Sequence, residues 1–374
     1  KTGLRISTYF SALKVKWLIE NNKNVQRACN ENRCMFGTVD SWVMWKLSGH
    51  KHHITDITNA SRTLLCNITT GEWDKELFQL FQIPSGIIMP TIRSSSEHYF
   101  TIGEGDFTDI PITGCLGDQQ AALVGNHCLQ SGEAKITYGT GCFLLFNTGN
   151  KITYSSCGLI TTVAFQFGPT GKKYYALEGS ISSAGSAVSW LKDKMEIIHS
   201  HAEVGIEAAK VKDTRGIFFV PAFNGLFAPR WRSDARGVIV GLTGSETKSH
   251  LCRAVLESVG YQAKEICDAM RTDSQTNITM LKVDGGMTTS DIFLQIQADI
   301  LGVDIKRPNF SETTVLGAAF AAGLHVGVYT DSDADQSDCS TFSPQISEEL
   351  RSANVKLWDR AVDCSCTFTQ ARLQ

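Results

Sequence analysis

The sequence has few prolines, little net charge and no long apolar run. Its 374 residues include eight prolines and carry a net charge of −3 at pH 7. So few prolines exclude proline-rich linkers, and a nearly balanced charge argues against nucleic acid or an anionic membrane surface as the main partner. No apolar run approaches the roughly 18 residues that span a bilayer, so we expect no integral membrane segment. Composition therefore predicts a soluble globular protein.

Paired cysteine motifs are also missing. The twelve cysteines are scattered and form no CxxC pair. In a chain of this length, that spacing fits neither the disulfide framework of a small secreted domain nor a zinc site. We therefore expect reduced thiols and a cytoplasmic location. The first residue is Lys1 and the first methionine is Met35, so we expect the sequence to be part of a longer polypeptide.

What the sequence does contain is an alternation of strands, glycine turns and helices. Residues 110–114 form a strand-like segment before a helical pattern at 121–124, and residues 135–147 suggest a hairpin around a glycine turn. Residues 281–286 form a short strand pattern that ends in two glycines before another helical pattern. With a length that predicts about two domains, this alternation indicates an α/β protein.

Three glycine-containing segments could bind phosphate groups. They are residues 139–141, residues 179–185 and the pair at 285–286. Glycine lets backbone N–H groups approach phosphate oxygens, and a helix that begins just after the turn adds the positive end of its dipole. None of the three matches a P-loop or a Rossmann fingerprint. Taken together, they favour phosphate chemistry.

Asp118 is the carboxylate that could take part in such chemistry. It follows a strand-like segment and precedes a helix. One interpretation is a helix N-cap, because Asp is a favoured capping residue. The other is a general base that accepts a hydroxyl proton during phosphoryl transfer. Periodicity does not decide between the two.

Longer motifs resemble a known family. Residues 9–21 and 237–257 resemble the two signatures of the FGGY carbohydrate kinases. Within that family, residues 36–42, 55–63, 117–123 and 138–143 are similar to the glycerol kinases. The resemblance runs almost continuously from Lys1 to about Tyr329.

The resemblance implies a two-domain, actin-like (ribonuclease H-like) α/β ATPase fold with the ATP site in the interdomain cleft. Residues 1–125 would be the remainder of the amino-terminal, substrate-binding domain, residues 126–330 the carboxy-terminal, nucleotide-binding domain, and residues 331–374 a loop and carboxy-terminal tail. The family's amino-terminal phosphate loop and Arg–Glu pair would lie upstream of Lys1. Their presence there would favour the kinase, and the absence of both would favour a non-catalytic module. The implied reaction is phosphorylation of glycerol by ATP and Mg²⁺ to sn-glycerol 3-phosphate, in a homo-oligomer (dimer or tetramer).

The resemblance also assigns roles to residues. Asp118 would be the catalytic base and a metal ligand. Tyr9 and Gln119 would bind the other hydroxyls, and Phe143 would contact the carbon chain. The nucleotide would be bound by Thr140, Gly185 and Gly286, to which we add Ser290, while Ser189 is left out. Two alternatives remain: another FGGY sugar kinase, or a non-catalytic fragment that acts as a binding module.

Overall fold

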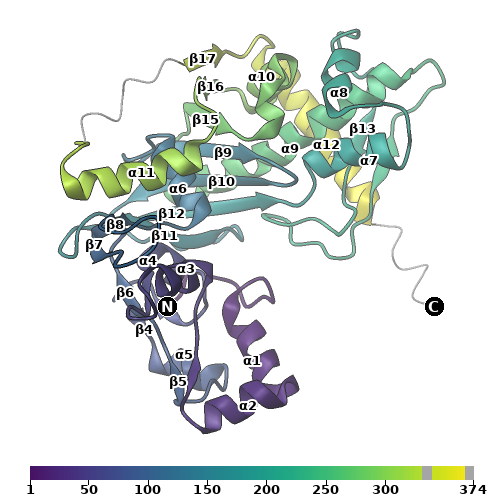
Figure 1. Cartoon of the computed structure of the whole chain (residues 1–374). Helices are drawn as coiled ribbons and strands as arrows, with labels where there is room; N and C mark the ends of the chain where they lie inside the picture. The colour runs from purple at the N-terminus through teal and green to yellow at the C-terminus, as the bar shows by residue number, and fades with distance from the viewer. Residues whose placement is uncertain (331–338, 367–374) are drawn as a thin grey trace.

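The structure, a computed structural model, describes residues 1–330 and 339–366 and has two lobes (Figure 1). The lower lobe contains the helices α1 (Ser11–Asn21), α2 (Lys23–Asn30), α3 (Val39–Leu47), α4 (Ile57–Ala60) and α5 (Lys75–Leu80). Its strands form short pairs: β1 (Cys34–Met35) with β5 (Ile87–Ile88), β2 (Ile54–Asp56) with β6 (Thr91–Arg93), and β3 (Cys66–Asn67) with β4 (Glu72–Trp73).

The first two helices of the lower lobe are separated by a single residue. The apolar residues of α1 extend from Leu13 to Ile19, α1 ends at Asn21, and α2 begins at Lys23. Asn22 separates them because its side chain accepts hydrogen bonds from the backbone N–H groups of Asn24 and Val25. Asn22 is thus the N-cap of α2.

The upper lobe is built on a seven-stranded mixed sheet with the strand order β11-β12-β10-β9-β15-β16-β17. Its strands are β9 (Ala134–Tyr138), β10 (Cys142–Gly149), β11 (Ile160–Gln166), β12 (Lys173–Ile181), β15 (Met280–Asp284), β16 (Asp304–Pro308) and β17 (Cys339–Phe342). β9 and β10 form the expected hairpin, and β9, β15 and β16 are parallel. Two further pairs flank the sheet: β7 (Ser96–Thr101) with β8 (Pro111–Gly114), and β13 (Phe218–Val220) with β14 (Val238–Val240).

The two faces of the central strand β9 differ in chemistry. Ile136 and Tyr138 join the main apolar core, which also includes residues of α9 (Lys248–Ser274) and α10 (Asp291–Leu301). Because side chains alternate along a strand, Lys135 and Thr137 point to the opposite face. That face is covered by α6 (Asp118–Gly125), which contacts β9, β10 and β11. The polar side of the sheet therefore lies under the helix that begins with Asp118.

Helix α6 is held in place by close backbone contact with α11 (Thr313–Val326) (Figure 1). A Cβ atom on Gly125 would lie 1.8 Å from the carbonyl oxygen of Thr313, and one on Gly317 would lie 1.8 Å from that of Ala121. Only glycine fits at either position, because real Cβ contacts are never that short. The backbone that carries Asp118 is thus fixed by a helix nearly 200 residues away in the chain.

The carboxy-terminal part differs from the expected loop and tail. β17 pairs with β16 in the main sheet, and α12 (Glu348–Cys366) buries Trp358 in the main core. The indole of Trp358 stacks on Tyr261 of α9 with ring centroids 5.2 Å apart. Residues 339–366 are therefore an integral part of the upper lobe, because they supply an edge strand and core contacts. Residues 331–338 and 367–374 of the predicted tail lie outside the described residues.

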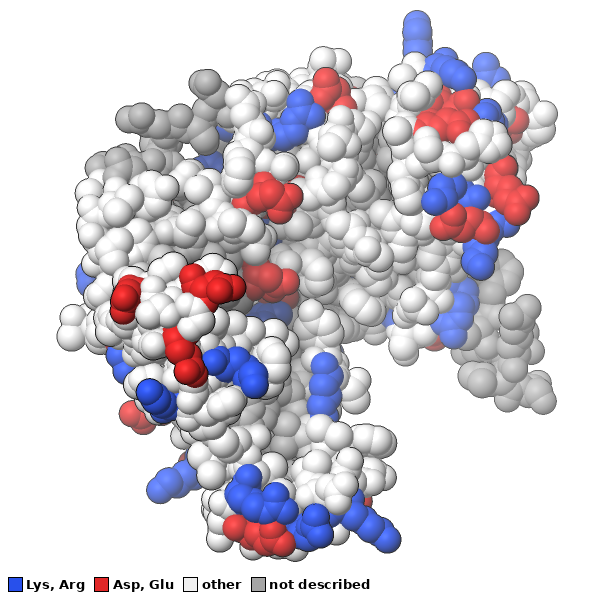
Figure 2. Space-filling model, in the orientation of Figure 1, with Lys and Arg blue, Asp and Glu red and all other residues white. Residues whose placement is uncertain are grey.

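Three other expectations concern thiols, membrane spans and charge. All twelve cysteines are free; Cys339 and Cys364 are exposed, and the others are buried or half-buried. No helix within residues 1–330 and 339–366 is both long and apolar enough to cross a bilayer. On the face shown in Figure 2, basic and acidic side chains lie interspersed.

Candidate active site

The three glycine-containing segments meet around one cavity of about 560 Å³. It lies between the β9–β10 turn, the start of α7 (Gly185–Asp193), α8 (His201–Ala208) and the short 3₁₀ turn Gly286–Thr289. The residues predicted for nucleotide binding all line it, namely Thr140, Gly185, Gly286 and Ser290. They come from three separate parts of the chain, and the fold brings them together.

Two glycines in this region are required by close packing. The N–H of Gly185 donates to the carbonyl of Gly139 at 3.0 Å, and a Cβ atom on Gly185 would lie 2.7 Å from that same oxygen. Gly285 has φ +95°, and its Cβ atom would lie 2.5 Å from the carbonyl oxygen of Tyr138. By contrast, no atom lies within 4 Å of a Cβ position on Gly286, which faces the cavity. The turns at Gly139 and Gly285 therefore pack tightly against neighbouring backbone, whereas Gly286 is exposed to the cavity.

Short polar side chains line the same cavity. Ser290 is also the N-cap of α10, where its hydroxyl accepts from the N–H of Phe293 at 3.4 Å. Ser189, which the sequence analysis left out, lies one turn after Gly185 and contacts His201, with 3.0 Å between Oγ and Nε2. The four-residue spacing from Gly185 on a helix could have indicated Ser189. His201 comes from another helix, and nothing in the sequence pairs it with Ser189.

Asp118 is not a helix N-cap. The N-cap of α6 is Gly117, and Asp118 is the first residue of the helix. Its Oδ1 accepts the backbone N–H of the next residue, Gln119, at 2.8 Å, and its side chain is exposed. The capping interpretation is therefore wrong, and the carboxylate faces outward at the start of the helix.

Phe143 lies on the same side of the sheet as α6. It stands opposite Thr137 of β9 and Ser180 of β12, and paired residues of neighbouring strands point to the same face. Its half-buried ring packs against a cluster that includes Leu123 and Val124 of α6. The strand register thus places the aromatic ring of Phe143 beside α6, the helix that begins with Asp118.

Tyr9 approaches this region from the lower lobe. It is 58% exposed and makes an edge-on contact with Phe10, with 5.2 Å between ring centroids. Partial burial of its hydroxyl raises the pKa of Tyr9, and the charges of Glu178 and Asp118 raise it further against the lowering effect of Arg62. The phenol of Tyr9 is thus electrostatically coupled to Arg62, Glu178 and Asp118.

A buried ion pair that the sequence analysis did not name lies beside Tyr9. Arg62 Nη2 donates to Glu178 Oε1 at 2.7 Å, and the side chain of Glu178 is 1% exposed. Burial lowers the pKa of Arg62, but Glu178, Tyr9 and Asp118 outweigh it, so the pKa is raised. Within the described residues, Nη1 of Arg62 and Oε2 of Glu178 are buried without a hydrogen-bond partner. The two residues are 116 positions apart, and no local motif predicts that they meet.

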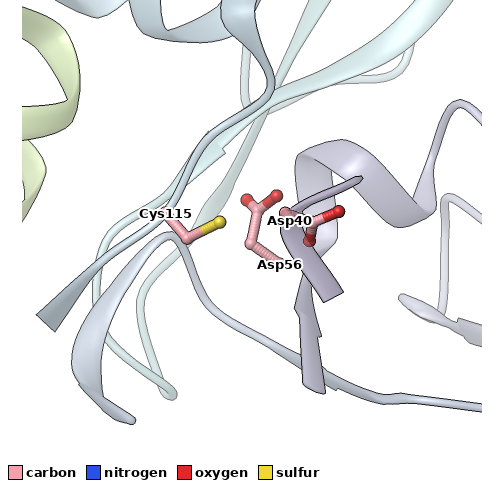
Figure 3. Close-up of side chains that lie close together, drawn as sticks. All are labelled: Asp40, Asp56 and Cys115. Carbon is pink, nitrogen blue, oxygen red and sulfur yellow. The ribbon is translucent and has the colours of Figure 1, made fainter. Parts of the chain in front are cut away.

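A separate cluster of Asp40, Asp56 and Cys115 has the ligand types of a metal site (Figure 3). Asp56, however, is the N-cap of α4. Its Oδ1 accepts from the N–H and side chain of Asn59 and from the hydroxyl of Thr58, and its Oδ2 accepts from the N–H of Thr58 and the hydroxyl of Ser95. Burial raises the pKa of Asp56 to about 6. Because both oxygens are already engaged, this cluster is a structural cap.

Comparisons with known proteins agree with this geometry. The chain matches the family models of the amino-terminal and carboxy-terminal domains of the FGGY family of carbohydrate kinases over residues 1–125 and 134–326. It is 49% identical to a probable glycerol kinase of Dictyostelium discoideum, covering 100% of this chain and 70% of that protein. It is 47% identical to a glycerol kinase of Beijerinckia indica, covering 97% of this chain and 73% of that protein.

Solved structures give the same result. The crystal structure of Plasmodium falciparum glycerol kinase with ADP matches with a TM-score of 0.91 and 41% identity, over 98% of this chain and 73% of that one. A gluconate kinase of Lactobacillus acidophilus, with a TM-score of 0.84 and 20% identity over 99% and 75% of the two chains, shares the fold. The chain thus has the two-domain, actin-like α/β fold and belongs to the FGGY family of carbohydrate kinases, on the branch of the glycerol kinases.

Proposed function

We propose that the chain catalyses the ATP-dependent phosphorylation of glycerol to sn-glycerol 3-phosphate. The observation that carries the proposal is the meeting of three glycine-containing segments around one cavity, in a chain at 47–50% identity to glycerol kinases. The ADP bound to the Plasmodium relative supports ATP as the phosphoryl donor. The backbone of Gly286 is exposed to the cavity, and Gly139 and Gly185 form a tight turn beside it. Both features favour phosphate binding, because glycine lets backbone N–H groups approach phosphate oxygens.

The acceptor would bind on the α6 side of the sheet. Asp118, exposed at the start of α6, would take the proton from the attacking hydroxyl. Gln119 and Tyr9 would pair the remaining hydroxyls, and the ring of Phe143 would cover the carbon chain. Polar partners for each hydroxyl explain selection of a small triol, because a site built to hydrogen-bond a hydroxyl rejects analogues that lack it.

Mg²⁺ fits the donor set beside Asp118. The second oxygen of this exposed carboxylate, Oδ2, has no hydrogen-bond donor among the described residues, whereas Oδ1 accepts from the backbone N–H of Gln119. Mg²⁺ is commonly held by one or two carboxylates together with substrate phosphates and water. When bound, the ion would neutralise charge on the transferring phosphoryl group. Asp56 does not fit this role, because five hydrogen bonds occupy its oxygens.

The test is ATP-dependent turnover with glycerol, measured with the complete polypeptide that includes the residues expected upstream of Lys1. The products sn-glycerol 3-phosphate and ADP are followed, with xylulose and gluconate as competing acceptors. We expect glycerol to be preferred. Preference for a sugar or sugar acid would favour the other FGGY kinases. ADP binding by calorimetry without turnover of any acceptor would favour a non-catalytic binding module.

Three further assignments complete the proposal. The division at residue 125 between a substrate-binding and a nucleotide-binding domain is testable by limited proteolysis. A homo-oligomer is testable by light scattering. A cytoplasmic location is supported by twelve free cysteines and is testable by cell fractionation.

A further inference from the structure

Lys135 is a completely buried lysine in the middle of the main sheet. It is 0% exposed, although lysine is almost never fully buried unless it is paired. Its ammonium donates to Gln119 Oε1 at 2.7 Å and to Thr137 Oγ1 at 2.7 Å. Burial lowers the pKa of Lys135, while Asp284, Glu178, Cys128 and Asp118 oppose that effect. Burying a cation costs folding free energy unless it is hydrogen-bonded or paired, so the burial of Lys135 against Gln119 requires an explanation.

The contact determines which way the amide of Gln119 faces. An ammonium group has three donors and no acceptor, so only the amide oxygen can face it. The NH₂ group of Gln119 must then point away from Lys135, and no described residue accepts a hydrogen bond from it. The half-buried Gln119 follows Asp118 directly at the start of α6. Its two side-chain N–H groups therefore point away from Lys135, at the start of the helix where Asp118 is the preceding residue.

We propose that Lys135 is a positioning residue that orients the Gln119 amide, so that its N–H groups donate to a hydroxyl oxygen of the acceptor alcohol. This inference rests on the proposed function and adds a specificity determinant to it. The acceptor must offer a hydrogen-bond acceptor at this position. An alcohol that lacks this hydroxyl leaves the amide donors unpaired, and the enzyme rejects it.

The neighbouring strand supplies a matched control. Lys282 of β15 stands directly opposite Lys135, and its ammonium donates to the backbone carbonyl of His127 at 3.1 Å. Replacing either lysine by methionine removes one cation from the same face of the same sheet. Only Lys135 contacts Gln119, so the two variants separate orientation of the amide from a general loss of charge.

The first experiment compares Lys135→Met with Lys282→Met. Kinetics with glycerol, propane-1,2-diol and propane-1,3-diol give KM and kcat, and calorimetry gives the ADP affinity. We expect Lys135→Met to raise the glycerol KM about tenfold and to reduce the discrimination against one of the two diols, with the ADP affinity unchanged within about twofold. Lys282→Met should keep the wild-type values. Equal effects of the two variants, or unchanged discrimination in Lys135→Met, would overturn the proposal.

A second variant decides the matter even if Lys135→Met does not fold. Gln119→Glu keeps an oxygen for Lys135 but has no N–H to donate. We expect it to fold and to lose glycerol affinity by about tenfold or more. Wild-type glycerol affinity in Gln119→Glu would overturn the proposal. Failure of the proposed function is distinguishable, because the wild-type protein would then prefer another acceptor, and the same variants would be compared on that acceptor.

Discussion

The cavity that we propose for the nucleotide and the region that we propose for the acceptor differ in the chemistry of the groups that form them. Backbone turns and short side chains line the cavity, where Gly185 packs against Gly139 and Gly286 stays open. Buried charges underlie the acceptor side, where Arg62 pairs with Glu178 and Lys135 holds Gln119. Phosphates can be bound by backbone N–H groups, which every non-proline residue has, provided that glycine lets the phosphate come close. A small alcohol needs oriented side chains, and these need partners of their own.

This difference predicts which substitutions reduce binding in each of the two regions. Crowding should damage the cavity, whereas loss of charge or of hydrogen-bond orientation should damage the acceptor side. Five substitutions test the contrast, beginning with the largest expected effect.

Asp118→Asn should lower kcat by about 10²–10⁴ while ADP and glycerol still bind, because the amide keeps the shape of the side chain and loses its basicity. Single-turnover kinetics and calorimetry separate the two effects. Asp106→Asn, in an exposed loop, is the control. Turnover of Asp118→Asn at the wild-type rate would remove Asp118 from the role of base.

Arg62→Met should destabilise the protein by about 3–5 kcal/mol, because it leaves Glu178 buried without its partner. Chemical denaturation measures this cost. The double variant Arg62→Met/Glu178→Gln should recover much of the stability, since no unpaired charge remains. If the double variant were no more stable than Arg62→Met, the charge of Glu178 would not be the cause.

Gly185→Ala should weaken ADP binding by about 1–3 kcal/mol, because its Cβ atom would lie 2.7 Å from the carbonyl oxygen of Gly139 and would displace the turn. The glycerol KM should change little. Gly103→Ala is the matched control, since no atom lies within 4 Å of its Cβ position. Equal ADP affinity in the two variants would contradict the packing argument.

Phe143→Ala should raise the glycerol KM about tenfold through lost apolar contact. Its fold must be checked by thermal melting, because the ring also packs against the cluster beside α6. Leu145→Ala, on the same face of β10 and fully buried, serves as control: it should lower stability and spare KM. A loss of stability in Phe143→Ala with unchanged KM would assign that ring to the core alone.

Ser290→Ala should show the smallest effect, a loss of about 1 kcal/mol of stability from the missing cap of α10. Ser189→Ala removes a cavity hydroxyl that is not a helix cap. Comparing the ADP affinity of both variants shows whether either hydroxyl contacts the nucleotide. A stability loss in Ser189→Ala as large as that in Ser290→Ala would contradict the capping argument.

Local patterns in the sequence predicted the turns and strands around the cavity well. The turn at Gly139, the glycine pair before α10 and the alternation of strands and helices are all found in the structure. The carboxy-terminal region was harder, because β17 and α12 become part of the lobe only by contacting β16 and α9, far away in the chain. Residues 350–362 do have a helical pattern, but the segment before them has the composition of a loop, and only these contacts show that both belong to the lobe.

The sequence by itself determined the family, the glycine turns and Asp118 at the start of a helix, because each depends on residues close together in the chain. Only the tertiary structure decided that Arg62 meets Glu178 across 116 positions and that Lys135 turns the amide of Gln119 outward. Both contacts join side chains from separate elements, and strand register and helix packing fix such distances. A lysine in a strand pattern is usually exposed to solvent, but here helix α6 covers Lys135 and brings it into contact with Gln119.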